Sequence, residues 1–263
     1  MSWMCGTRSK DSTTFSKVTA DEAKKLDELA KGFADHLTAL TRGVLGEDTP
    51  RFHAINRGSK VQVSPIDERE VMRRIPIRIG GEHHLSLGVR YFCCWDAQSE
   101  FLATDMADIG VFYRSIPDPL LRFEYVRASN ELPGAHMHVH AHRDEMAYLL
   151  RLAERGLPRQ GLRKNKLPRL SEMHLPVGGH RMRPALEDVL LLLHREFAID
   201  TVEGWRSVLN ESLRTWRLTQ LKAAVRDAPD AAARVLRALG YEVKEPSVPA
   251  ARPAPEDVKL YWP

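Results

Sequence analysis

The most constraining feature of this chain is a hydrophobic pattern with a period of two in its middle third. Apolar and polar residues alternate over residues 85–95, and similar stretches occupy 74–79, 101–114 and 121–127. Because successive side chains of a β-strand point to opposite faces, each stretch predicts a strand with one buried face. Short turns and no helical segment separate the stretches, which predicts an antiparallel meander. Pro76 predicts an edge position for the first of them.

Helical patterns flank this region. Apolar residues recur at helical spacing behind a capping box over residues 16–45, and further helices are expected at 145–152, 184–197, 202–227 and 231–239. With 263 residues, of which 43% are apolar, the chain can bury a substantial core. We therefore expect an α+β protein with an N-terminal helix, an antiparallel sheet of four to five strands and a C-terminal helical cap.

The same patterns divide the chain into four segments. We expect a disordered N-terminus over 1–17, a helix and sheet over 18–145, a basic helical region packed on the sheet over 146–243, and a tail rich in Pro and Ala over 244–263. The three cysteines fit neither a disulfide framework nor a zinc spacing, and no apolar run is long enough to span a membrane. These features predict a cytoplasmic protein without a membrane partner.

Four histidines alternate with small or apolar residues near the end of the predicted sheet: His136, His138, His140 and His142. On a strand, all four imidazoles would line one face. Imidazole exchanges protons near neutral pH and is also the commonest metal ligand. The row therefore predicts either acid–base chemistry or a metal site.

A hairpin between 121–127 and the histidine row would add further polar groups to this face. A turn centred near Glu131 sets Glu124 opposite His138 and Arg122 opposite His140. The apolar residues of both strands then share the other face, which supports the pairing. The polar face is expected to open onto a cleft beside the cationic helices.

Two chemistries fit this face, and the sequence leaves both open. In a metal-free site, His138 and His140 exchange protons with a phosphodiester, Arg122 holds the developing negative charge and Glu124 orients an imidazole. In a metal site, a divalent ion such as zinc or manganese is held by two or three of the four histidines, and a nearby carboxylate completes the shell.

A second cluster suits phosphate binding. Residues 151–183 carry nine Arg or Lys against two acidic residues. A glycine turn leads from this segment into the helix after Pro184, and helix N-termini attract anions. An ordinary turn with solvated charges is the alternative. The candidate substrate-binding residues are Gly178, Gly179, His180, Arg181 and Arg183.

Two local resemblances favour nucleotide chemistry. The row His136, His138 and His140, or equally His138, His140 and His142, resembles the motif of the histidine triad family, which acts on nucleotide phosphates. The span 121–145 resembles TumE-type toxins of bacterial toxin–antitoxin modules, which implies an RNA-directed toxin and an antitoxin protein as partner. Segments 175–186 and 205–243 look like uncharacterised actinobacterial proteins.

The sequence thus predicts a toxin-like ribonuclease or phosphodiesterase that acts on RNA or a nucleotide phosphate at the histidine face. The alternative is a noncatalytic protein that binds nucleic acid or a protein partner, with solvated histidines or a structural metal.

Overall fold

The computed structural model describes most of the predicted elements. The described residues are 20–67, 69–96, 99–114, 116–128, 133–140, 175–177 and 179–244. Several predictions lie outside them: those for 1–17, the helix at 145–152, His142, Gly178 and the tail over 245–263.

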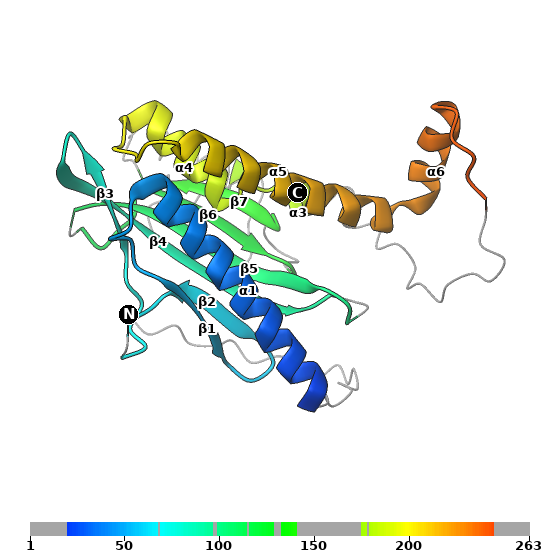
Figure 1. Ribbon diagram of the computed structural model, residues 1–263, viewed down its shortest axis with the longest axis horizontal. Helices are drawn as coiled ribbons and strands as arrows, with labels where there is room; N and C mark the ends of the chain where they lie inside the picture. Colours follow the sequence, from blue (N-terminus) through cyan, green and yellow to red (C-terminus); the bar gives the residue numbers. More distant parts are fainter. Residues whose placement is uncertain are drawn as a thin grey trace, which may run out of the picture.

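The core of the fold is one antiparallel sheet with helices across one of its faces (Figure 1). Its strands are β1 (Phe52–Asn56), β2 (Val61–Pro65), β3 (Ile75–Ile79), β4 (Glu82–Trp95), β5 (Leu102–Tyr113), β6 (Leu121–Val126), β7 (Ala135–Val139) and β8 (Leu175–Pro176). They lie in the order β1-β2-β4-β5-β6-β7-β8, with β3 paired to β4. The predicted α+β class and antiparallel meander are confirmed.

The sheet is larger than expected, because the described residues alone form eight strands instead of four or five. The hairpin of β1 and β2 falls in a segment of mixed polarity. Its sequence predicts a short strand at 60–63, which overlaps β2, but not β1, which alternates only partly between buried and exposed residues. At the other end, β8 pairs with β7, so the histidine strand is not the last.

Five helices belong to the described residues: α1 (Ala20–Leu45), α3 (Gly179–Met182), α4 (Leu186–Phe197), α5 (Trp205–Asp227) and α6 (Pro229–Ala238). The long helices α1 and α5 contact each other and lie on the same side of the sheet (Figure 1). Helix α6 stands at the far end of α5, away from the sheet, and none of its residues is buried. None of these helices has the length and apolar character needed to cross a bilayer.

The hydrophobic core fills the space between the helices and the sheet. Alternate residues of the central strands point into it, including Val89, Ile109 and Phe123, and they pack with Leu37 of α1 and Leu209 of α5. Burying a side chain of this size contributes about 1.5–3 kcal/mol. Because the alternation is strict, the residues between them point to the opposite face of the sheet.

On that opposite face, an aromatic ring lies over two glycines. A Cβ atom on Gly110 would lie 2.7 Å from the ring of Phe112, and one on Gly88 would lie 3.1 Å from it. The guanidinium of Arg74 lies 3.5 Å from the centre of the same ring. The two glycines therefore leave the space that Phe112 occupies.

Candidate functional site

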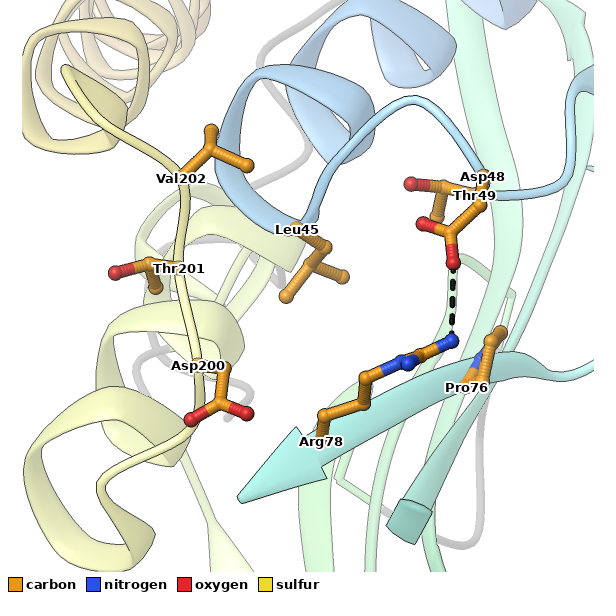
Figure 2. A pocket seen from close by; sticks show the side chains of 8 residues that line it. All are labelled: Leu45, Asp48, Thr49, Pro76, Arg78, Asp200, Thr201 and Val202. Carbon is orange, nitrogen blue, oxygen red and sulfur yellow. Dashed lines mark hydrogen bonds and ion pairs between the residues drawn. The ribbon is translucent and has the colours of Figure 1, made fainter. Parts of the chain in front are cut away.

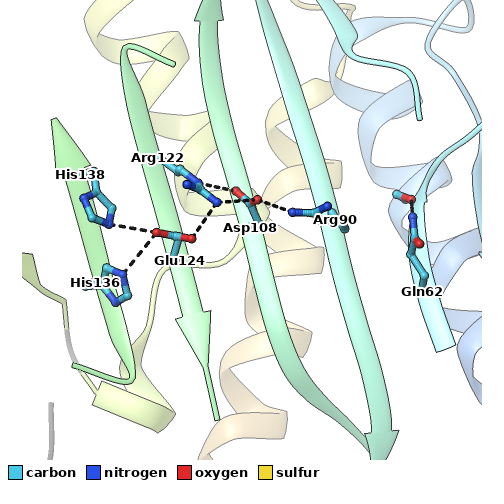
Figure 3. Close-up of polar contacts among 8 residues, drawn as sticks. Gln62, Arg90, Asp108, Arg122, Glu124, His136 and His138 are labelled. Atoms are coloured by element: carbon cyan, nitrogen blue, oxygen red, sulfur yellow. Dashed lines mark hydrogen bonds and ion pairs between the residues drawn. The ribbon is translucent and has the colours of Figure 1, made fainter. Parts of the chain in front are cut away.

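Charged and imidazole side chains form a connected row across the face of the sheet opposite α1 and α5, here called the polar face (Figure 3). The row crosses four neighbouring strands and comprises Arg90 of β4, Asp108 of β5, Arg122 and Glu124 of β6, and His136 and His138 of β7. Alternate residues of a strand share one face, and the residues of the row occupy positions that all point to the same face of the sheet. The pairing of the four strands then places them side by side.

The pairing of β6 with β7 differs from the predicted register. Glu124 lies opposite His136 and Arg122 opposite His138, a slip of two residues from the expected partners. The N–H of Val126 donates to the carbonyl oxygen of Gly134 at 2.7 Å, which centres the pairing one residue earlier in the chain. Because the slip is even, every side chain keeps its predicted face.

Glu124 and two histidines converge at the end of this row. The Oε2 atom of Glu124 lies 2.9 Å from Nε2 of His138 and 3.4 Å from Nε2 of His136. One potential ligand atom from each of the three residues lies within 4.8 Å of the other two. Both histidines are buried, with 3% and 7% of their surface exposed. We call Glu124, His136 and His138 the ligand triad.

The protonation of His136 constrains what this triad can hold. Its Nδ1 atom lies 2.8 Å from the carbonyl oxygen of Pro133, which can only accept a hydrogen bond, so Nδ1 carries a proton. In a neutral ring, Nε2 is then an acceptor that faces a carboxylate oxygen. Two acceptors at this distance require a positive group between them, which is either a proton on Nε2 or a metal ion.

The second oxygen of Glu124 is engaged elsewhere. Arg122 Nη2 lies 2.8 Å from Oε1 of Glu124, and its Nε and Nη2 atoms each donate to Asp108 at 3.0 Å. Arg90 also donates to Asp108 at 3.0 Å. Burial favours the neutral form of Glu124, but hydrogen bonds from His136 and His138 and the charge of Arg122 outweigh it and lower its pKa. Glu124 is therefore a carboxylate with Oε2 directed at the two imidazoles.

His140 lies just past the end of β7, where its backbone N–H donates to Leu120 at 3.0 Å. Its ring is half-buried, and burial, together with the neighbouring His138, lowers its pKa. Among the described residues, the atoms that converge in the ligand triad do not include those of His140. Of the four histidines predicted to bind a metal, His136 and His138 thus belong to the triad with Glu124, and His142 lies outside the described residues.

The predicted phosphate-binding arginines lie on the other side of the sheet. The guanidinium of Arg183 is buried 4.1 Å from the ring centre of Tyr125 and 4.7 Å from that of Trp216. Arg181 pairs with Asp227 of α5 at 2.6 Å. Because Tyr125 and Glu124 are consecutive strand residues, they face opposite sides. Arg181 and Arg183 therefore do not border the histidine face, whereas the basic residues of 151–169 lie outside the described residues.

The rest of that second cluster is only partly described. The backbone of Gly179 and His180 belongs to α3, whereas Gly178 lies outside the described residues. A phosphate-binding role for Gly178, Gly179 and His180 stays a prediction.

Sequence reasoning missed two members of the row, Arg90 and Asp108. Each is a charged residue at an outward position of a strand whose inward positions are apolar. The signal was present, because successive strands carry charges of opposite sign at these positions: Arg90, Asp108 and then Arg122. What the sequence lacks is the register that sets the three side by side.

A separate small cavity of about 180 Å³ lies where the end of α1 meets β3 and residues 200–202 (Figure 2). Its charged groups already have partners. Arg78 pairs with Asp48 at 3.2 Å, and Asp200 accepts from the backbone N–H groups of Gly80 and Gly81. These contacts tie the turn between β3 and β4 to the helical half, and we assign the cavity a structural role.

No known protein family, curated protein or solved structure matches this chain. The resemblances to the histidine triad family and to TumE-type toxins stay predictions.

Proposed function

We propose that the protein is a metal-dependent phosphodiesterase that cleaves RNA or a nucleotide phosphate at the ligand triad. The observation that carries this proposal is the approach of two imidazole Nε2 atoms to one carboxylate oxygen, with the Nδ1 of His136 committed to Pro133. Two histidines and one carboxylate form the protein ligands of catalytic zinc sites and of several iron and manganese sites.

The contacts of Glu124 favour a catalytic site over a purely structural one. Its Oε1 atom is bonded to Arg122, so the carboxylate offers one oxygen to an ion instead of two. Structural zinc sites use four protein ligands, whereas catalytic sites use three and leave a position for water or substrate. A divalent ion held by the triad would supply Lewis-acid chemistry to a phosphoester.

Arg122 supports phosphate as the substrate group. It uses Nε and Nη2 to hold Asp108 and Glu124, which leaves Nη1 to donate to an oxygen of the substrate. A fixed guanidinium beside the reacting group stabilises the negative charge that develops on phosphate. The net charge of +4 also favours an anionic substrate.

The metal-free mechanism remains the nearest alternative. The 2.9 Å contact between Glu124 and His138 would orient that ring for proton transfer, with His140 as the second proton-transfer group and Arg122 holding charge. A noncatalytic binder of nucleic acid or of an antitoxin protein is the alternative of another class.

Elemental analysis and turnover on labelled RNA test these proposals together. We expect about one zinc or manganese ion per chain, cleavage that a chelator stops and that the ion restores, and loss of the ion in Glu124→Gln and His138→Ala. His53→Ala removes an exposed histidine of β1, which lies far from the triad in the sheet. This matched control should keep both the bound ion and the cleavage activity.

Two results would contradict the metal-dependent enzyme. Cleavage that persists in chelator and disappears in His138→Ala and His140→Ala would support the metal-free mechanism. Absence of turnover, combined with salt-sensitive RNA binding, would support the noncatalytic binder.

A further inference from the structure

Helix α5 has apolar residues on two sides, and only one of these sides packs against the core. Leu209 and Leu213 are buried toward the core. Leu218, Leu221 and Val225 are 39%, 55% and 47% exposed. At 100° per residue, these three lie within about 60° of one another and more than about 100° from Leu209. A helix with a second apolar stripe normally buries that stripe as well.

A groove of about 400 Å³ follows the exposed side of α5. It is lined by Asn210, Leu213, Arg214, Arg217, Leu218 and Leu221. Their spacing follows the helical repeat over three turns, so the groove runs along the helix axis for about 16 Å. All six residues belong to α5, so the groove is an open hollow on the surface of one helix, and a second helix lying along it can place its anchors there every three or four residues.

The charges around the groove identify the kind of helix that fits. Arg214 and Arg217 are 68% and 67% exposed, and their carboxylate partners Glu211 and Asp188 lie at 3.7 and 3.3 Å. Single ion pairs this exposed contribute less than about 1 kcal/mol, so both arginines can pair with an incoming carboxylate. Residues 205–238 carry seven basic side chains against three acidic ones.

We propose that the exposed side of α5 is a docking surface for an acidic amphipathic helix of another protein. Leucine-like anchors of the partner would cover Leu218, Leu221 and Val225, while its Asp and Glu residues would pair with Arg214 and Arg217. A second copy of this chain is a poor occupant, because it would bring the same positive rim and repel. This surface is on the opposite side of the sheet from the ligand triad and is independent of the proposed chemistry.

The test uses the full-length protein and a labelled synthetic helix of about 20 residues with Leu at heptad spacing and Glu at the flanking positions. A second peptide carries Lys at every Glu position. We expect the Glu peptide to bind at least about tenfold more tightly than the Lys peptide, and binding to weaken at higher salt. Fluorescence anisotropy measures both.

The decisive variant is Leu221→Glu, which places a negative charge in the middle of the stripe. It should weaken binding of the Glu peptide at least about tenfold, while Leu239→Glu, at an even more exposed leucine just beyond the end of α6, should change binding less than about twofold. Because Leu221 is exposed, the melting temperature should stay unchanged.

Equal effects of the two variants, or binding of the Lys peptide as tight as that of the Glu peptide, would overturn the proposal. So would a Leu221→Glu defect seen only with RNA or with anionic phospholipid vesicles, because these outcomes would assign the surface to a different class of partner.

Discussion

At the scale of single residues, Glu187 is a buried carboxylate outside the polar face. It is buried where α1, α4 and α5 meet, and Ser212 donates to its Oε1 atom at 2.5 Å. Since the Ser212 hydrogen is used in this bond, His36 Nε2, at 2.9 Å, donates to the serine oxygen. One chain of hydrogen bonds thus joins three helices.

This network predicts a pH-dependent stability. Burial opposes the charge on Glu187, but the imidazole of His36, whose Nε2 atom lies 3.9 Å from Oε1, and the hydrogen bond from Ser212 outweigh it and lower the pKa of Glu187 in the folded protein. The carboxylate therefore adds stability above its ordinary pKa of 4.5, and this contribution is lost as the pH falls through the lower folded value. Glu187→Gln should lower the free energy of unfolding by about 1–3 kcal/mol near neutral pH and by less in acid.

Urea denaturation at neutral and acidic pH measures this difference. Glu211→Gln, at an exposed position of α5, is the control and should change the unfolding free energy by less than about 0.5 kcal/mol at either pH. A cost of Glu187→Gln that is the same at both values would show that the charge of Glu187 does not contribute.

Asp108 is the residue that holds Arg122 against Glu124. Both of its oxygens bind the guanidinium of Arg122, which in turn engages Oε1 of the ligand carboxylate. Replacing a group that orients a metal ligand typically lowers the metal affinity about 10–100-fold. We expect a loss of this size for zinc binding in Asp108→Asn, measured by competition with a chromophoric chelator. Asp35→Asn, at an exposed position of α1 on the other side of the sheet, is a control that should leave the affinity unchanged.

At the scale of elements, β4 and β5 depend on the absence of side chains at their central glycine pair. A methyl group on Gly110 would overlap the Phe112 ring, whereas one on Gly32 of α1 would meet no atom within 4 Å. Gly110→Ala should therefore destabilise the protein by about 1–3 kcal/mol. Gly32→Ala should stabilise it by about 0.5–1 kcal/mol, because alanine is the better helix former. Thermal unfolding of the two variants should shift in opposite directions.

The elements also show what the sequence could and could not predict. The strict alternation of β4 and the leucine spacing of α1 predicted these elements directly, because each has one fully buried face. The sequence predicted that Glu124 and the histidines share the polar face, because a register shift by two residues leaves every side chain on the same face. The sequence did not predict which residues of β6 and β7 lie opposite one another. That register goes with the hydrogen bond from the N–H of Val126 to the carbonyl oxygen of Gly134, which no residue pattern encodes.

The placement of Arg181 and Arg183 away from the polar face has a physical cause as well. Arg181 and Arg183 are ordinary surface residues by composition, but one pairs with Asp227 and the other is stacked between two aromatic rings. Partners this distant in sequence come together only through the packing of α3 and α5 on the sheet. Charge counts along the chain cannot distinguish such arginines from those free to bind phosphate.

At the scale of the whole molecule, stability is distributed unevenly from the sheet to the far end of α5. The central strands and α1 supply the core, whereas α6 has no buried residue. Segments with few buried contacts open locally at low cost. Hydrogen exchange measured by mass spectrometry should show rapid exchange in residues 229–238 and slow exchange in β4 and β5. Protection of α6 equal to that of β4 would mean that a partner covers it in solution.

The short strand β8 has a consequence for the molecule as a whole. Its two residues pair with Met137 and His136, and α3 begins three residues after the strand ends, at Gly179. The strand β7, which carries His136 and His138, is therefore paired with the segment that precedes α3. A ligand that displaces β7 would therefore also shift β8 and the start of α3. In this way the backbone connects the polar face of the sheet to its helical side.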